Sequence, residues 1–188
     1  MSTVTSLPVH HTWTVDDLDH TPDDGNRYEL IDGTLIVTPA PVPSHQRASM
    51  RLAVILVSAC PPGCEVFAAP LDVRLAGDTA VQPDLLVVDP ANLTDRGLAG
   101  PPLLAVEILS PSTRLIDLNL KKARYEVARC PSYWIIDPGL RGAPSITAWH
   151  LDGDHYALAG TAAGEETLHL TAPFPVDITP VALVTRGG

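Results

Sequence analysis

The sequence predicts a mixed α/β domain in which a central mixed β-sheet is flanked by helices. Short apolar runs predict strands, two segments with an apolar period of about 3.6 residues predict helices, and 19 prolines with 13 glycines predict frequent turns. The 188 residues suffice for one domain, and 45 % hydrophobic residues exclude a disordered chain. We expect a single domain over 1–188, with its core at about 13–175 and tails at 1–12 and 180–188.

The N-terminal region predicts a short helix and a β-hairpin. The helix follows Thr14, because acidic residues in its first turn suit the helix dipole. The hairpin spans 28–38, where two apolar runs flank Asp32-Gly33. Glycine tolerates the positive φ that a type I′ turn requires, so this dipeptide favours a tight turn.

A helix is expected over 44–59, with Ser44 as its N-cap and an apolar stripe that includes Leu52 and Leu56. A loop rich in glycine and proline is expected over 89–102. The remaining apolar runs predict strands at 65–76, 80–88, 103–109, 132–137, 146–150, 155–158 and 167–170.

A second long helix is expected over 115–128. Its apolar stripe should pack inward and consists of Ile116, Leu120, Ala123 and Val127. Asp117, Lys121 and Tyr125 form another stripe, displaced by about 100° around the helix axis. The Lys121 side chain can therefore point along the edge of the sheet.

Two predicted strands contain a carboxylate that a buried strand should not have without a reason, because an unpaired buried charge is costly. Asp84 opens one apolar run, and Glu107 lies within another, on the same face as Ala105 and Leu109. If the strands are neighbours, the two carboxylates converge. Such a pair raises the pKa of each group unless a cation lies between them, and Mg²⁺ suits that arrangement. A lysine beside the metal, here Lys121, could orient an attacking water and help to deprotonate it.

The order of these motifs resembles the Uma-two family of restriction-endonuclease-like proteins, within the PD-(D/E)XK nuclease superfamily. The resemblance covers about residues 13–175. It rests on Tyr28-Glu29-Leu30-Ile31-Asp32-Gly33, Pro83-Asp84, Val106-Glu107-Ile108-Leu109-Ser110-Pro111-Ser112-Thr113, Asp117, Lys121, Tyr125 and Tyr133-Trp134-Ile135-Ile136-Asp137.

The resemblance implies a restriction-endonuclease-like fold and a Mg²⁺-dependent phosphodiester hydrolase, with Mn²⁺ as a substitute. Asp84 corresponds to the acidic residue of the first motif and Glu107 to that of the second, with the Ile108 carbonyl as a further metal ligand. Leu109 stands where the second motif usually has lysine, so the strict pattern fails there. Lys121 on the following helix takes the place of that lysine.

Two further residues match family positions. Glu29 corresponds to an early acidic position and could join the site as a further acid. His45 matches a position whose role the resemblance does not define, and Arg114, Lys122 and Arg124 are further candidates for binding substrate.

Each assignment has a structural alternative. Asp84 and Glu107 could be strand-end carboxylates that a backbone N–H or an arginine satisfies. Lys121 could form a solvated i, i+4 ion pair with Asp117. Glu29 could point outward from the hairpin. For His45 we favour a role at the start of its helix over one in the site.

The charge of −10, from 12 basic and 22 acidic residues, excludes nucleic-acid binding by bulk electrostatics. Positive charge gathers in 114–129, where five basic and two acidic residues leave 5 − 2 = +3. We therefore expect weak or assisted nucleic-acid binding, and two copies could pair such helices in a homodimer.

The sequence does not support several other kinds of site or protein class. Cys60 and Cys64 have no second Cys/His pair at suitable spacing, so we expect no zinc site, and no glycine-rich loop predicts a nucleotide cofactor. Three cysteines, no signal-peptide pattern and no apolar run of about 18 residues predict a cytoplasmic protein without a membrane segment.

Three functions are compatible with these observations. The first is a Mg²⁺-dependent endonuclease acting on nucleic acid, with DNA as the expected substrate. The second is a nuclease-fold protein that no longer cleaves and serves as a binding or scaffold module. The third is a metal-dependent hydrolase of a small phosphoester.

Overall fold

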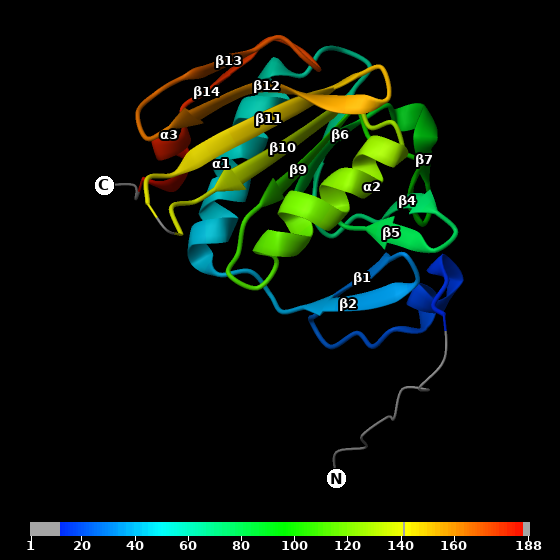
Figure 1. Ribbon diagram of the computed structural model, residues 1–188. Coiled ribbons are helices and arrows are strands. Elements are labelled where there is room, and N and C mark those ends of the chain that lie inside the picture. Colours follow the sequence, from blue (N-terminus) through cyan, green and yellow to red (C-terminus); the bar gives the residue numbers. More distant parts are fainter. Residues whose placement is uncertain (1–11, 141, 186–188) are drawn as a thin grey trace.

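The computed structural model describes residues 12–140 and 142–185. Most strands belong to two six-stranded sheets, and helices cover both faces of the sheet at the centre of the molecule (Figure 1). The mixed α/β class predicted from the sequence is confirmed.

The central sheet has the strand order β12-β11-β10-β9-β6-β3. β9 and β10 are parallel, since a helical crossover connects them, and the other neighbouring pairs are antiparallel. The strands are β3 (Glu65–Ala68), β6 (Leu85–Val88), β9 (Leu104–Ile108), β10 (Ser132–Asp137), β11 (Ser145–Asp152) and β12 (His155–Ala163).

The second sheet has the order β2-β1-β5-β4-β8-β7. Its last two strands lie in the segment expected to be a loop over 89–102, so that expectation was incomplete. The strands are β1 (Arg27–Ile31), β2 (Thr34–Thr38), β4 (Val73–Ala76), β5 (Thr79–Val81), β7 (Leu93–Thr94) and β8 (Gly97–Ala99), and two 3₁₀ helices flank them, η1 (Val15–His20) and η2 (Pro90–Asn92).

The predicted hairpin is confirmed as β1 and β2. Ile31 pairs with Thr34 across the turn, and Asp32 and Gly33 have φ values of 53° and 71°. Positive φ at both central residues is the requirement of a type I′ turn, which explains why the Asp-Gly dipeptide stands here. The 3₁₀ helix η1 also follows Thr14 as expected, in a capping box with Asp17.

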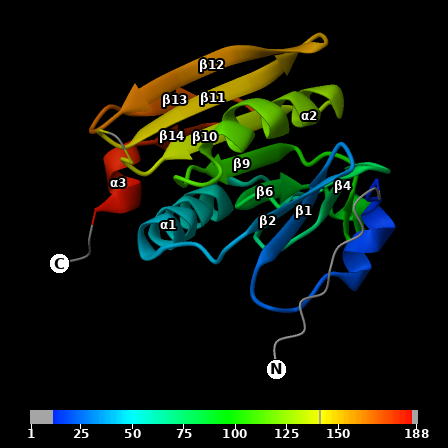
Figure 2. The same cartoon turned by 60° about the horizontal axis from the view of Figure 1, so that its bottom comes forward.

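The helix α1 (Pro43–Ala59) covers one face of the central sheet, and the connection 39–42 leads into it from the hairpin (Figure 2). Its N-cap is Val42, because Pro43 takes the first helical position, where a missing N–H costs nothing. The expectation that Ser44 caps the helix was therefore wrong. The buried residues of α1 are His45, Ala48, Leu52 and Leu56.

The chain ends in two short strands and a helix on the same side as α1. These are β13 (Leu168–Leu170), β14 (Val176–Ile178) and α3 (Pro180–Val184). Leu183 of α3 is fully buried, so the expected tail from residue 180 is instead part of the fold up to residue 184. The expected tail at 1–12 lies outside the described residues except for its last one.

The helical crossover between β9 and β10 consists of the π-helix η3 (Ile116–Lys121) and the helix α2 (Lys122–Val127). Its buried residues are Asp117, Lys121 and Tyr125, whereas Val127 is 71 % exposed. The expectation that the apolar stripe packs inward holds for Ile116 and Leu120, which are partly buried against the core, and was wrong for Ala123 and Val127, which are exposed. The inward face meets carboxylates as well as apolar side chains.

The two faces of the central sheet form different cores. Leu85, Val106 and Ile108 pack against α1, whereas Leu86 and Ala105 pack against Tyr125 of α2 and against the second sheet. Leu109 belongs to this second core, so strand alternation places Glu107 on the same side. In the part of the chain that the structure describes, no helix is both long and apolar enough to cross a membrane.

Candidate active site

A cavity of about 130 Å³ lies where β1, β6, β9, α1 and η3 meet. The connection 39–42 and the turn 110–113 form part of its wall. Its ionisable lining residues are Arg27, Glu29, His45, Asp84, Glu107, Asp117 and Lys121. The four acidic side chains and Lys121 are almost completely buried, which is unusual for charged groups and identifies this cavity as the candidate site.

The pairing of β6 with β9 brings Asp84 and Glu107 together. Leu85 is opposite Val106 in this antiparallel pair, so one more residue along each strand places Asp84 beside Glu107. The condition stated from the sequence, that the two strands be neighbours, is met.

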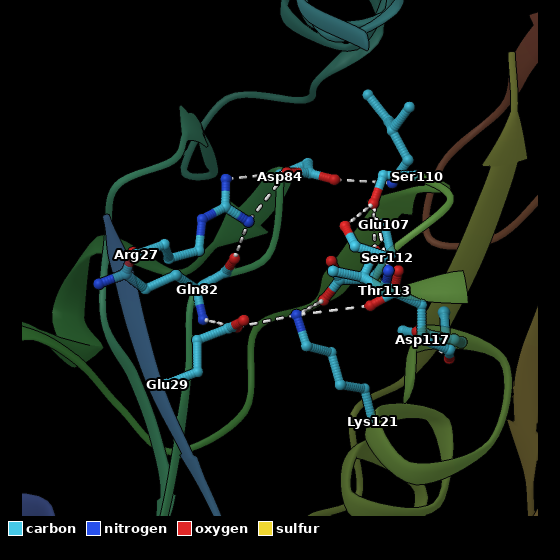
Figure 3. Close-up of polar contacts among 12 residues, drawn as sticks. Arg27, Glu29, Gln82, Asp84, Glu107, Ser110, Ser112, Thr113, Asp117 and Lys121 are labelled. Carbon is cyan, nitrogen blue, oxygen red and sulfur yellow. Dashed lines mark hydrogen bonds and ion pairs between the residues drawn. The ribbon is translucent and has the colours of Figure 1, made fainter. Parts of the chain in front are cut away.

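Lys121 is held by three carboxylates. Its Nζ lies 2.8 Å from Glu29 Oε1, 3.2 Å from Glu107 Oε1 and 3.6 Å from Asp117 Oδ1 (Figure 3). Glu29 Oε1 also accepts a hydrogen bond from the Gln82 backbone N–H at 2.7 Å. Asp117 Oδ1 has no hydrogen-bond partner and is buried. The ion pair of Asp117 with Lys121 is therefore an interior one, and not the solvated pair considered above.

Asp84 is held by a different set of donors. Arg27 donates from Nη1 and Nη2 to Oδ1, both at 3.1 Å (Figure 3). The backbone N–H of Ile108 donates to Oδ2 at 2.7 Å, and His45 Nε2 lies 3.0 Å from the same oxygen. An ionised carboxylate only accepts hydrogen bonds, so the Nε2 atom of His45 carries the proton.

These contacts shift the pKa values in opposite directions. Burial raises the pKa of Glu107 well above its usual range, Lys121 opposes this, and the neighbouring carboxylates add to it. Burial likewise raises the pKa of Asp117, against the effect of Lys121. Burial also acts to raise the pKa of Asp84, but the hydrogen bonds and charges of His45, Arg27 and Ile108 outweigh it and lower the pKa.

Burial acts to lower the pKa of Lys121, but Glu107, Glu29 and Asp117 outweigh it and raise the pKa. The raised pKa values of Lys121 and Glu107 are compatible, because one ammonium group serves three carboxylates. Lys121 therefore stays protonated at neutral pH. It donates hydrogen bonds to Glu29 and Glu107.

The raised pKa of Glu107 predicts a pH-dependent stability. A carboxyl group whose pKa is raised in the folded state stabilises the fold when protonated, and this contribution is lost as pH rises through the folded pKa. Glutamine does not ionise, so Glu107→Gln does not lose this stability as the pH rises. In EDTA, we expect the melting temperature of Glu107→Gln minus that of the wild type to increase from about pH 5 to about pH 8. A difference that stays constant over this range would contradict the raised pKa.

Comparisons with known proteins show the family and the fold of the chain. The profile of the family Uma2, described as "Putative restriction endonuclease", matches residues 15–184. The chain belongs to this family. No curated protein matches the sequence.

The Uma2 chain is also similar to a solved structure. A protein from Anabaena variabilis ATCC 29413, described as a "putative nuclease belonging to DUF820", superposes with a TM-score of 0.67. The sequences are 19 % identical, and the match covers 86 % of this chain and 89 % of that one. At this identity the likeness shows that the two proteins share a fold.

The donor set of this Uma2 site fits a divalent metal ion. Its four carboxyl groups face two permanent cations, Arg27 and Lys121, so that, apart from His45, the acidic groups outnumber the basic ones by 4 − 2 = 2. Carboxylate oxygens are also the ligands that Mg²⁺ prefers. As the side chains stand, no three His, Cys, Asp or Glu residues within 12–140 and 142–185 are grouped to hold a metal. Instead, the amino group of Lys121 lies among Glu29, Glu107 and Asp117, and the guanidinium of Arg27 is bonded to Asp84.

The structure brings together Glu29, Asp84, Glu107 and Lys121, the four residues proposed as catalytic. Ile108 lines the cavity, and its N–H group is engaged by Asp84. His45 is buried against Asp84, so our preference for a role at the start of its helix was wrong.

Sequence reasoning missed Arg27 and assigned Asp117 no part of its own in the site. Arg27 precedes the hairpin motif, and no local pattern marks it, because its partner Asp84 is 57 residues away. Asp117 carried a signal, since it shares the i, i+4 stripe with Lys121. That stripe was expected to point along the sheet edge, but only Lys121 was considered for the site.

The other proposed substrate-binding residues lie outside the cavity lining. Arg114 Nη1 donates to Asp137 at 2.9 Å, and Arg124 Nη2 donates to Asp32 at 2.6 Å. The Lys122 Nζ atom lies 4.8 Å from the centre of the Trp149 ring. Arg129 pairs with Asp154. The positive balance of 114–129 is thus largely neutralised by neighbouring side chains.

Proposed function

We propose that this protein is a Mg²⁺-dependent endonuclease that hydrolyses phosphodiester bonds of nucleic acid, with DNA as the expected substrate and Mn²⁺ as a substitute metal. The observation that supports this proposal most strongly is the meeting of Asp84, Glu107 and Lys121 at one buried cavity lined by four carboxyl groups. Family membership and the nuclease fold of the structural neighbour point in the same direction.

The residues proposed as catalytic have distinct roles in this proposal. Asp84 and Glu107 would hold the metal, with the Ile108 carbonyl as a further ligand. Bound Mg²⁺ supplies charge neutralisation at the phosphate and lowers the pKa of a coordinated water. Lys121, fixed by Glu29 at 2.8 Å, would donate a hydrogen bond that orients the attacking water. In-line attack at phosphorus would leave a 3′-hydroxyl and a 5′-phosphate.

In this proposal, the isolated chain binds nucleic acid weakly and needs a partner to bind substrate well. The protein is acidic, and the basic residues of 114–129 are each engaged with a neighbour. Affinity for nucleic acid comes largely from basic side chains on phosphates. We therefore propose weak binding by the isolated chain, and assistance from a second copy in a homodimer or from another partner that brings the substrate.

The second candidate is a nuclease-fold module that binds or scaffolds without cleaving. The same engaged basic residues favour it, because a protein that does not process a polyanion has no need of a free basic surface. Metal binding and cleavage separate this module from the endonuclease.

The test combines melting with a cleavage assay on the EDTA-treated wild-type protein. A ligand that binds the folded state raises the melting temperature, by a free energy of RT ln(1 + [L]/Kd). We expect millimolar Mg²⁺ or Mn²⁺ to raise it, and the rise to vanish in the double variant Asp84→Asn/Glu107→Gln. With metal, we expect nicking of supercoiled DNA, with single-stranded DNA and RNA run in parallel.

Three outcomes are distinguishable in this test. A melting shift together with cleavage supports the endonuclease. A shift without cleavage of any of the three nucleic acids favours the non-cleaving module, or a hydrolase of small phosphoesters if a chromogenic phosphodiester is cleaved. The absence of any shift at millimolar metal would refute the metal-dependent proposal.

A further inference from the structure

Asp84 differs from the other carboxylates of the cavity in how fully its oxygens are used. A carboxylate has about four lone-pair positions. Oδ1 accepts from two nitrogens of Arg27, and Oδ2 accepts from His45 and from the Ile108 N–H. All four positions are therefore occupied by donors of the protein itself.

Asp117 presents the opposite situation in the same cavity. Its Oδ1 has no hydrogen-bond partner, and its nearest cation, Lys121 Nζ, is 3.6 Å away. A metal that enters the cavity thus meets an open oxygen on Asp117. Asp84 can become a ligand only if one of its present donors leaves.

Arg27 is the donor that can leave. The Ile108 N–H belongs to the central sheet, and His45 is buried on α1. The side chain of Arg27 is 20 % exposed, so it has a path to solvent. Its departure would also free the most lone pairs on Asp84, because it occupies both lone pairs of Oδ1. The Gln82 carbonyl, 3.1 Å from Nη1, is its other recorded partner and can remain one after Asp84 is released.

We propose that Arg27 is a resident cation that occupies Asp84 in the metal-free protein and must release this carboxylate before a divalent metal can bind there. This inference rests on the proposed function, since it concerns the same metal site. It makes Arg27 a positioning residue that stabilises the metal-free fold and weakens metal binding. A merely structural arginine would support both.

The test is calorimetric titration of Mn²⁺ into EDTA-treated wild type, Arg27→Met and Arg27→Lys. Methionine keeps much of the side-chain volume and removes the donors. We expect Arg27→Met to melt at a lower temperature than the wild type without metal, yet to bind Mn²⁺ on the order of tenfold more tightly, because the metal no longer displaces two charge-assisted hydrogen bonds.

Arg27→Lys separates the lone-pair effect from the general effect of charge. Lysine keeps the positive charge but is a point donor that does not fork across Oδ1. We expect it to bind Mn²⁺ more tightly than the wild type, though less tightly than Arg27→Met does. If Arg27→Lys has wild-type affinity, charge alone sets metal binding and the proposal is overturned.

Arg74→Met is the matched control. Arg74 is also half-buried, with 29 % of its side chain exposed, and it lies 3.8 Å and 3.9 Å from two carboxylates, but outside the cavity. We expect its variant to leave Mn²⁺ affinity unchanged. Unchanged or weaker binding by Arg27→Met, with a wild type that binds, would overturn the inference and leave the metal site standing. Absence of binding by all variants would overturn both proposals.

Discussion

Glu107→Gln is expected to abolish metal-dependent cleavage, with a loss on the order of 10³-fold or more, while the protein stays folded. The substitution keeps the shape of the side chain and removes the charge that a metal ligand needs. Glu107 is buried, and its carboxyl group already has a raised pKa, so a neutral amide in its place does not add a desolvation cost. Lys121 keeps Glu29 at 2.8 Å as a partner.

The measurement is single-turnover nicking of supercoiled DNA, together with a melting curve for each variant. Glu65→Gln is the matched control, because Glu65 is an exposed strand carboxylate outside the cavity. We expect Glu65→Gln to cleave DNA at the wild-type rate. Full activity of Glu107→Gln would show that this carboxylate is not a metal ligand, whatever the melting curves show.

Lys121→Met is expected to destabilise the protein by about 3–5 kcal/mol, the usual cost of removing one partner from a buried ionic cluster. The Lys121 side chain is 2 % exposed, and its ammonium group is the common partner of Glu29, Glu107 and Asp117. Without it, three buried carboxylates repel one another. They can escape this cost only by binding protons, so the loss should be smaller at about pH 5 than at about pH 8.

Urea unfolding of the wild type and of Lys121→Met at both pH values measures this effect. Lys122→Met is the control, because the neighbouring residue makes a half-buried contact with the Trp149 ring and should cost only about 0.5–1 kcal/mol. A loss in Lys121→Met that is the same at both pH values would indicate a packing defect and not unpaired carboxylates.

Local patterns were sufficient for much of the secondary structure. The Asp32-Gly33 hairpin follows from the positive φ that its turn requires, and the strand around Glu107 follows from its apolar neighbours. Short elements with weak patterns were missed, among them β7, β8, β14 and α3. Their few residues carry too little periodicity, and they are stabilised by contacts with distant parts of the chain.

The sequence also determined which residues were chemically out of place. A carboxylate in an apolar strand implies a compensating partner, and this reasoning singled out Asp84 and Glu107 before any contact was known. Helix spacing had already suggested Lys121, and the family resemblance supported it and added Glu29. What the strands could not reveal was the partner itself, because ionic compensation acts through space and leaves no periodic signal along the chain.

The tertiary structure alone decided the direction of the helix that carries Lys121 and the partners of Asp84. An amphipathic pattern says which side chains share a face, but not which face meets the sheet when the sheet itself presents carboxylates. Arg27 and His45 reach Asp84 from 57 and 39 residues away. The sequence by itself thus determined Asp84, Glu107 and Lys121 as candidates, and folding determined the partners that hold Asp84, since only the folded chain brings those groups within hydrogen-bond distance.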